Sequence, residues 1–235
     1  MFKYCLIFFL GLSGFSLHVT AQQDSIGAIK KRFDQEYGLN VQLYNGHYYY
    51  SETNIVKGNP FWKNDSLLIG DLFIAGNEFK NQFLRYDLYR QNFLLIFTDQ
   101  MGAQRIIVLD SEKIDSIKFG DNLFQPNHFS DINNQFIQLL HKGKFSCYLN
   151  WTVERNFNST GDKLGYQYLK NNYEIFMDWN GELRKIKKRK QFIELFPLDV
   201  QNQILVYIKE HSIRWRRMNL NQLKTMLNAC DKYLE

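Results

Sequence analysis

The chain has 235 residues, of which 45% are hydrophobic, 16% aromatic and 23% charged, and its formal net charge is +5. These values are typical of a globular protein with a substantial core, and they exclude a disordered or fibrous chain. Only three prolines are present, which excludes a proline-rich linker, and no repeat with a period of about 20–50 residues is visible, which argues against a solenoid.

The N-terminus has the pattern of a secretory signal peptide over residues 1–21. Met1–Lys3 gives a positive start, Tyr4–Leu17 is an uncharged apolar run, and Val19-Thr20-Ala21 precedes polar residues. The apolar run is shorter than the ~20 residues that a membrane-spanning helix needs. We therefore expect cleavage after Ala21, export to the periplasm or the cell exterior, and no transmembrane segment in the mature chain. An uncleaved anchor is the alternative.

From residue 40 to residue 182 the sequence is typical of short strands joined by tight turns. Asn45-Gly46 predicts a hairpin between residues 41–44 and 47–52, and the uniformly apolar Phe93–Phe97 predicts a central strand. Further elements are expected as strands at 67–74, 79–89, 105–109, 114–119, 136–140 and 145–153, a polar loop at 156–165, and a hairpin of 173–179 with 182–186 around Asn180-Gly181.

The last fifty residues have helical spacing instead. A short helix over 188–196 is expected to end before Pro197. Asp199 can cap a second helix and Asn219 a third. The third helix carries one apolar stripe, formed by Leu220, Leu223, Leu227, Cys230 and Leu234. Such a stripe must be buried, and one face of the sheet is the simplest partner.

These elements predict one α+β domain over residues 22–235. Its β-rich part, 22–186, is expected to be an antiparallel β sheet, roll or sandwich of about ten strands. Its helical part, 187–235, is expected to supply two to three C-terminal helices that pack on the sheet. No break in composition indicates a second domain.

Two cysteines, Cys147 and Cys230, remain after removal of the signal peptide. Export places them in an oxidising compartment, where one disulfide between them is possible. The alternative is a pair of buried thiols that pack as small hydrophobic side chains.

Several turn and strand motifs lie along the mature chain: Tyr44-Asn45-Gly46, Gly58-Asn59-Pro60-Phe61, Leu84-Arg85-Tyr86-Asp87, Lys187-Lys188-Arg189-Lys190 and Lys232-Tyr233-Leu234. With these motifs the sequence resembles a family of uncharacterised secreted or periplasmic proteins of the Bacteroidota phylum, over most of the mature chain. The resemblance implies an exported protein with a β-rich N-terminal part and a helical C-terminus, and it implies no catalytic residue.

The same phylum O-glycosylates exported proteins at Asp followed by Ser or Thr and then an apolar residue. Three segments match this pattern: Asp24-Ser25-Ile26, Asp65-Ser66-Leu67 and Asp115-Ser116-Ile117. A helix cap at Ser25 and a strand residue at Ser116 explain two of the matches equally well.

Motifs for catalysis and metal binding are absent from the mature sequence, which has no HExxH, CxxC, GxSxG or phosphate-binding glycine loop. His141 and Cys147 can approach across a turn as base and nucleophile. Asp71, Glu78 and Asp87 can supply paired carboxylates. A turn histidine, a core cysteine and a solvated ion pair explain them more simply, so no catalytic residue, metal or cofactor is expected.

Aromatic residues cluster early in the mature chain, at Tyr44, Tyr48, Tyr49, Tyr50 and Phe61-Trp62. Exposed aromatic side chains stack on sugars or on partner surfaces. Tyr48 and Tyr50 share one face of a strand and Tyr49 takes the other, so at least one face is expected to be core.

The C-terminal part is basic, with 12 basic and 5 acidic residues between Arg184 and Glu235, a balance of +7. Arg214, Arg216 and Arg217 follow a dense basic tract, which consists of Arg184, Lys185, Lys187, Lys188, Arg189 and Lys190. Such a field attracts anionic lipid or glycan phosphate, and nucleic acid is not expected for an exported protein. The alternative is a solvated strand end and helix start.

The sequence thus favours an exported cell-envelope protein that acts by binding or structural association and not by catalysis. Two alternatives stay open. One is a carrier or sensor of an apolar or lipid ligand held between the sheet and the helices. The other is a hydrolase with an unrecognised site.

We predict that the exported protein begins at Gln22, because the apolar run ends in Val-Thr-Ala immediately before polar residues. Intact-mass spectrometry of the protein recovered from the producing cells checks this. A mature chain that still carries residues 1–21 would contradict the prediction.

Overall fold

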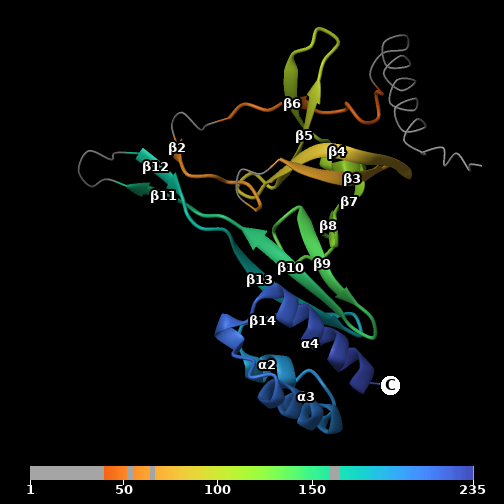
Figure 1. The fold of residues 1–235 in the computed structure, drawn as a ribbon, viewed down its shortest axis with the longest axis vertical. Helices are drawn as coiled ribbons and strands as arrows, with labels where there is room; N and C mark the ends of the chain where they lie inside the picture. Colours follow the sequence, from red (N-terminus) through yellow and green to blue (C-terminus); the bar gives the residue numbers. More distant parts are fainter. Residues whose placement is uncertain (1–39, 52–55, 64–66, 159–164, 235) are drawn as a thin grey trace, which may run out of the picture. The chain divides into compact units, whose positions relative to one another are not determined.

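A computed structural model describes residues 40–51, 56–63, 67–158 and 165–234 (Figure 1). The signal-peptide prediction and the glycosylation matches at Ser25 and Ser66 lie outside these residues. Internal contacts divide the chain into two compact units, residues 1–40 and 41–235.

The described residues of this second unit form an eleven-stranded antiparallel sheet and a second sheet of three short strands, followed in the sequence by three α-helices. The strand order in the large sheet is β1-β6-β5-β4-β3-β7-β8-β9-β10-β13-β14, and in the small sheet β11-β12-β2. The strands are β1 (His47–Tyr48), β2 (Val56–Lys57), β3 (Leu68–Ile74), β4 (Asn77–Asp87), β5 (Asn92–Thr98), β6 (Gln104–Val108), β7 (Ile114–Phe119), β8 (Asn122–Pro126), β9 (Phe136–Lys142), β10 (Ser146–Thr152), β11 (Arg155–Asn158), β12 (Gly165–Tyr168), β13 (Asn172–Trp179) and β14 (Glu182–Ile186).

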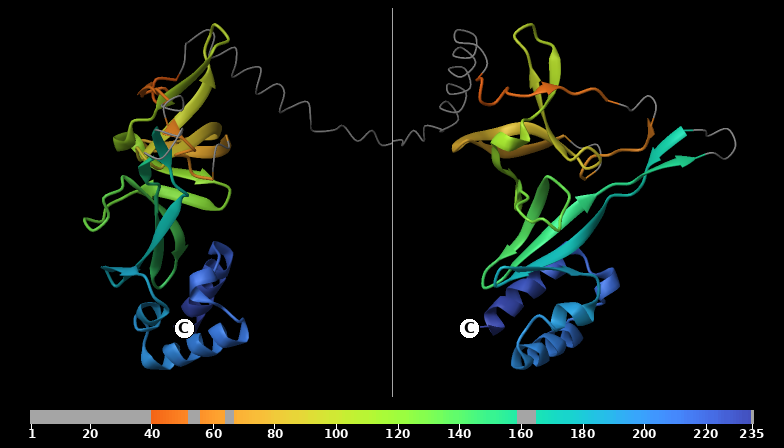
Figure 2. Two further views of the ribbon diagram at one scale, coloured as in Figure 1. Left: turned by 90° about the vertical axis from the view of Figure 1, so that its left-hand side faces the viewer. Right: turned by 180° about the vertical axis from the view of Figure 1, so that it is seen from behind.

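The helices are α2 (Arg189–Ile193), α3 (Leu198–Glu210) and α4 (Leu220–Tyr233), with short 3₁₀ turns η1 (Ser111–Lys113) and η2 (Trp215–Arg217). They gather at the end of the large sheet formed by β9, β10, β13 and β14 (Figures 1 and 2). The predicted α+β class, with the strands before the helices, is confirmed.

The position of β5 in the centre of the sheet explains why its sequence is uniformly apolar. It pairs with β4 on one side and β6 on the other, and its alternate side chains enter two different clusters. Phe93 and Leu95 join the main core, while Leu94 and Ile96 pack with Phe61 on the other face. A strand that is buried on both faces shows no polar alternation.

The main core is built largely from aromatic rings. Tyr86 stacks on Phe93 across β4 and β5, with ring centroids 4.2 Å apart, and Phe93 meets Phe136 edge to face at 4.8 Å. Trp62 meets Phe124 edge to face at 4.9 Å. Such geometries add roughly 0.5–1.5 kcal/mol per pair to the burial of the rings. Part of the high aromatic content is therefore core.

The hairpin predicted at Asn45-Gly46 is wrong. Residues 41–44 form a turn, and β1 pairs with the distant strand β6, with His47 opposite Val108. Gly46 passes so close to β6 that a Cβ atom there would lie 1.7 Å from the Val108 carbonyl oxygen. The Asn45 side chain accepts a hydrogen bond from the Asp110 amide at 3.2 Å. Asn45 and Gly46 thus allow the chain to pair with the distant strand β6 and do not form a hairpin turn.

Three further predictions are corrected in detail. The predicted polar loop at 156–165 contains strand residues, because β11 and β12 pair across it. The β8 strand has no counterpart among the predicted strands. Pro197 and not Asp199 occupies the cap position of α3, and Asp199 lies in its first turn. The hairpin around Asn180-Gly181 is confirmed as β13 and β14.

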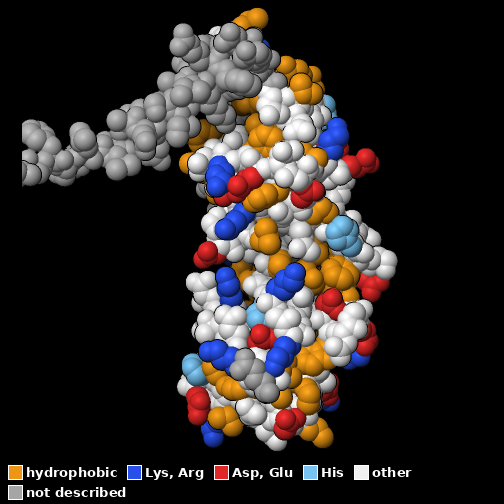
Figure 3. Space-filling model, turned by 90° about the vertical axis from the view of Figure 1, so that its right-hand side faces the viewer, with side chains coloured by type: hydrophobic (Ala, Val, Ile, Leu, Met, Phe, Trp, Pro, Cys, Tyr) orange, Lys and Arg blue, Asp and Glu red, His pale blue; other side chains and the backbone are white. Residues whose placement is uncertain are grey.

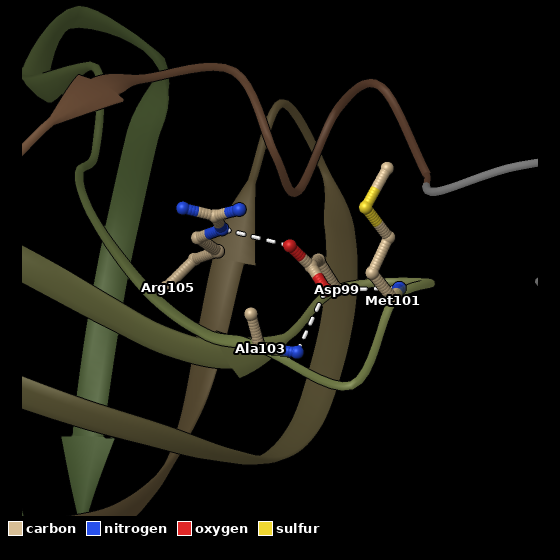
Figure 4. Close-up of polar contacts among 4 residues, drawn as sticks. All are labelled: Asp99, Met101, Ala103 and Arg105. Carbon is tan, nitrogen blue, oxygen red and sulfur yellow. Dashed lines mark hydrogen bonds and ion pairs between the residues drawn. The ribbon is translucent and has the colours of Figure 1, made fainter.

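The turn between β5 and β6 is organised by Asp99 (Figure 4). Its carboxylate accepts hydrogen bonds from the amides of Met101 and Ala103 at 2.9 and 2.8 Å, and from Arg105 Nε at 2.7 Å. The bond from Arg105, followed by that from Ala103, lowers the pKa of Asp99. Because the folded-state pKa is the lower one, this stabilisation is present above the unfolded pKa and is lost as the pH falls through the folded value.

The last helix is an integral part of the core, as predicted. Leu223, Met226, Leu227 and Cys230 are at most 1% exposed and pack in one cluster with Phe145. The remaining buried members of this cluster come from the sheet, from the other helices and from the segments that follow α2 and α3: Cys147, Met177, Ile186, Phe192, Ile193, Phe196, Val200, Ile204, Ile208 and Ile213. Asn219 caps α4 by accepting a hydrogen bond from the Gln222 amide at 2.9 Å, as predicted.

A polar edge of α4 fastens the turn between β9 and β10. Asp231 Oδ1 accepts a hydrogen bond from the Lys144 amide at 2.7 Å. The Nδ1 atom of His141 lies 3.0 Å from Asn228 Oδ1. Gly143 leaves room for the carboxylate, since a Cβ atom there would lie 2.3 Å from Asp231 Oδ2.

We expect Leu227→Asp to lower the free energy of unfolding by more than ~3 kcal/mol, because it buries an unpaired charge in an apolar cluster. Thr225→Asp, on the exposed side of the same helix, should change it by less than about 0.5 kcal/mol. Urea denaturation of both variants measures the difference. Equal stability of the two variants would show that α4 is not part of the core.

We expect Gly143→Ala to cost about 1–3 kcal/mol of stability, because the new Cβ displaces the Asp231 carboxylate. In an Asp231→Ala background the same change should be neutral or slightly stabilising, since alanine restricts the unfolded chain. A double-mutant cycle of unfolding free energies measures this coupling. An additive result would mean that the backbone at residue 143, and not Asp231, sets the cost.

Candidate ligand-binding groove

His141 and Cys147, the suspected base and nucleophile, are neighbours in the structure, but both are buried. The two residues are register partners across β9 and β10. Cys147 is fully buried, and burial raises the pKa of its thiol. The His141 ring instead contacts α4. Its Nδ1 lies 3.0 Å from Asn228 Oδ1, and its Nε2 lies 3.7 Å from Asp231 Oδ1. A protonated, inaccessible thiol is not a nucleophile.

The two cysteines proposed as a disulfide pair are both free thiols in the structure. Cys147 and Cys230 are buried in the same apolar cluster. Burial raises the pKa of Cys230 to about 12. Both side chains therefore pack as small hydrophobic groups in the form described here.

The three suspected carboxylates are each engaged separately. Asp71 accepts a hydrogen bond from the Asn81 amide at 3.1 Å, and Glu78 pairs with Lys80 at 3.4 Å. Asp87 is 1% exposed and accepts hydrogen bonds from Tyr49 Oη at 3.0 Å and from two backbone amides. Burial raises the pKa of Asp87, and the hydrogen bonds oppose that shift. Its contacts fix the turn after β4.

The early aromatic cluster divides between core and surface. Phe61 and Trp62 are 3% and 2% exposed, whereas Tyr48 and Tyr50 are 56% and 78% exposed. Tyr49 is half-buried on Asp87. The cluster is therefore not one exposed stacking surface.

Two adjoining cavities form a groove beside β10 and the segment between β12 and β13. Their volumes are about 650 and 520 Å³. Both are lined by Trp151, Leu169, Lys170 and Asn171. The first cavity is also lined by Thr152, Glu154, Asn172 and Tyr173, and the second by Gly58, Asn59, Trp62, Lys63, Asn122, Tyr168 and Leu220.

Trp151 is the rigid wall that both cavities share. Its indole Nε1 donates a hydrogen bond to the buried Gln138 Oε1 at 2.7 Å, and its carbonyl accepts one from Asn134 Nδ2 at 2.7 Å. Its ring lies 5.0 Å from that of Tyr173 and 6.0 Å from that of Trp62. The half-buried ring is thus held from several sides and keeps part of its surface open to the groove.

Polar groups of the groove are held in place as well. Asn171 Nδ2 donates to the Phe61 carbonyl at 2.8 Å, and Asn59 Oδ1 accepts from the Phe61 amide at 2.7 Å. Gln138, which holds Trp151, also donates to Asn122 Oδ1 at 2.9 Å. Oriented amides beside an aromatic wall are the composition of a specific small-molecule site.

The groove is weakly basic. Its described lining contains Lys63 and Lys170, against Glu154 as the one carboxylate. The Lys63 ammonium lies 4.5 Å from the centre of the Trp62 ring. Within the described ranges, no carboxylate lies within 4 Å of Lys170. An anionic group on a ligand would meet positive charge at this rim.

Sequence reasoning did not find this groove. Trp62 belongs to the predicted aromatic cluster, whereas no sequence motif singles out Trp151 or Lys170. They come from segments about 90 to 110 residues further along the chain, and the pairing of β2 with β12 joins their neighbourhoods. No local motif records such a juxtaposition.

Three of the six residues in the basic tract form ion pairs with carboxylates. Arg184 pairs with Glu182 at 2.8 Å, Lys190 with Glu194 at 3.5 Å, and Lys185 with Glu174. Arg184 and Lys185 belong to β14, an edge strand, where charge prevents pairing with other chains. On the face drawn in Figure 3, Lys and Arg side chains are interspersed with Asp and Glu side chains.

Comparison of this chain with protein-family models, curated proteins and solved structures finds no match. In the described residues, no helix is both long and apolar enough to cross a membrane, and no group of three or more potential metal-ligating side chains occurs.

Ser116 lies within β7, half-buried, and Asp115 accepts a hydrogen bond from the Gly76 amide at 2.7 Å. The third glycosylation match is therefore a strand segment.

Proposed function

We propose that this protein is an exported, non-enzymatic binding protein that holds an acidic saccharide in the groove at Trp151. The observation that carries the proposal is the rigid Trp151 wall, which is flanked by the oriented amides of Asn59 and Asn171. A sugar ring presents a flat C–H face to an aromatic ring and hydroxyl groups to amides. Both halves of that chemistry are present here.

An acidic sugar is favoured over a neutral one by the charge at the rim. Lys63 and Lys170 line the same groove, and Lys170 has no carboxylate within 4 Å among the described residues. A charge-assisted hydrogen bond to a carboxylate is about twice as strong as a neutral one. We therefore propose a uronic acid as the recognised unit.

Binding is favoured over hydrolysis by the count of carboxylates. Glycoside hydrolysis uses two carboxyl groups about 5–9.5 Å apart. The described lining of the groove contains Glu154 and not Asp87, whose carboxylate is already engaged by Tyr49 and the Tyr89 amide. A lipid between sheet and helices is less favoured, because Phe145, Phe192, Met226 and their neighbours fill that region. Export rests on the N-terminal sequence pattern.

The test is a calorimetric titration of the mature protein with hexagalacturonate and, separately, with neutral maltohexaose. We expect binding of the acidic oligosaccharide. Lys170→Glu should weaken it about tenfold or more, since it replaces an attractive charge by a repulsive one. Lys209→Glu makes the same charge change on the exposed side of α3 and should leave the affinity unchanged.

Trp151→Phe provides a second variant, because it keeps most of the packing while shrinking the stacking surface and removing the bond to Gln138. It should weaken binding without unfolding the protein. Equal affinity for both oligosaccharides would overturn the acidic preference. Failure of both to bind the wild-type protein would overturn the saccharide proposal.

A further inference from the structure

We infer that six basic side chains from two separate segments form one surface that docks on the phosphate headgroups of an anionic membrane. This inference is independent of the saccharide groove. The six residues are Lys187, Lys188, Arg189, Arg214, Arg216 and Arg217, all exposed.

The two segments are joined by Trp215, which lies between the three arginines. Its indole Nε1 donates a hydrogen bond to the Lys187 carbonyl at 3.3 Å. Its ring lies 5.3 Å from the ring of Phe192, a fully buried residue of α2. The η2 turn is thereby fixed beside the end of β14 and the start of α2, although 28 residues separate Trp215 from Lys187.

The six cations lack the carboxylate partners that neutralise the neighbouring cations. Arg184, Lys185 and Lys190 each pair with a carboxylate. Among the described residues, by contrast, no carboxylate lies within 4.0 Å of any of the six. The sequence itself has no Asp or Glu in residues 183–193 or 211–230, so local pairing is not available to them.

Protection of the sheet edge does not account for this surface. That role needs charge on β14, which Arg184 and Lys185 provide. The arginines of η2 and its flank lie outside the sheet, and adjacent like charges repel one another in the free protein. An external anionic partner would relieve that repulsion.

A phospholipid surface fits the composition. Arginine binds phosphate oxygens through two parallel hydrogen bonds, and lysine adds charge without fixed geometry. Trp215 is half-buried at the centre of the surface, and tryptophan favours the headgroup level of a membrane. The surface thus combines phosphate-binding cations with an aromatic side chain of the interfacial type.

The test is sedimentation of the mature protein with vesicles of phosphatidylcholine alone and of phosphatidylcholine with 30% phosphatidylglycerol, which is about one anionic lipid in three. We expect binding to the anionic vesicles only. The binding should fall as salt rises from about 0.1 M to about 1 M, because the Debye length falls from about 10 to 3 Å.

The variant Lys188→Glu/Arg216→Glu reverses one charge in each segment and should reduce binding at least about tenfold. The control Lys118→Glu/Lys209→Glu changes the net charge equally at exposed positions elsewhere and should bind like the wild type. Thermal melting establishes that both variants fold. If the first variant does not fold, Lys188→Gln/Arg216→Gln replaces it, with an expected loss of several-fold.

Three results would overturn the inference. Binding to both kinds of vesicle alike, or to neither, removes the anionic headgroup as the partner. An equal loss in the control variant means that net charge alone is responsible. Binding of soluble polyphosphate without binding to vesicles would assign the surface to a soluble polyanion.

Discussion

The packing of the Trp62 ring is the interaction on which the described architecture depends most. Its ring packs against Phe119, Phe124 and Trp151, which belong to three different strands. Its amide donates to the Tyr86 carbonyl at 2.9 Å, so its backbone is tied to a fourth strand. Its Nε1 is buried without a hydrogen-bond partner among the described residues. That orphan donor costs about 1–3 kcal/mol, which the burial of a large ring in an aromatic cluster offsets.

The same contact creates the groove. Trp62 packs on Trp151 of β10, and the segment that precedes Trp62 pairs with β12 through β2. The neighbouring Phe61 backbone then binds the side chains of Asn59 and Asn171. The core and the groove thus share one set of contacts. The groove is rigid for the same reason that the core is well packed.

The helical end follows a different constraint. Its sheet strands and helices share one apolar cluster, and polar contacts from α4 to the β9–β10 turn set the position of the last helix. This arrangement leaves the basic residues outside the core, where only water, carboxylates or an external anion can meet them. The flanking cations Arg184 and Lys190 pair with carboxylates of this chain, while among the described residues the cations around Trp215 have no carboxylate within 4.0 Å.

The sequence by itself determined the α+β class, the order of strands before helices, the central strand at Phe93–Phe97 and the cap at Asn219, because these follow from local periodicity and turn chemistry. Only the tertiary structure decided that Asn45-Gly46 serves a pairing with β6, that His141 and Cys147 are core, and that Trp62 meets Trp151. Those outcomes depend on contacts between residues far apart in the chain. Such contacts are selected by packing and burial over the whole fold, which no short segment encodes.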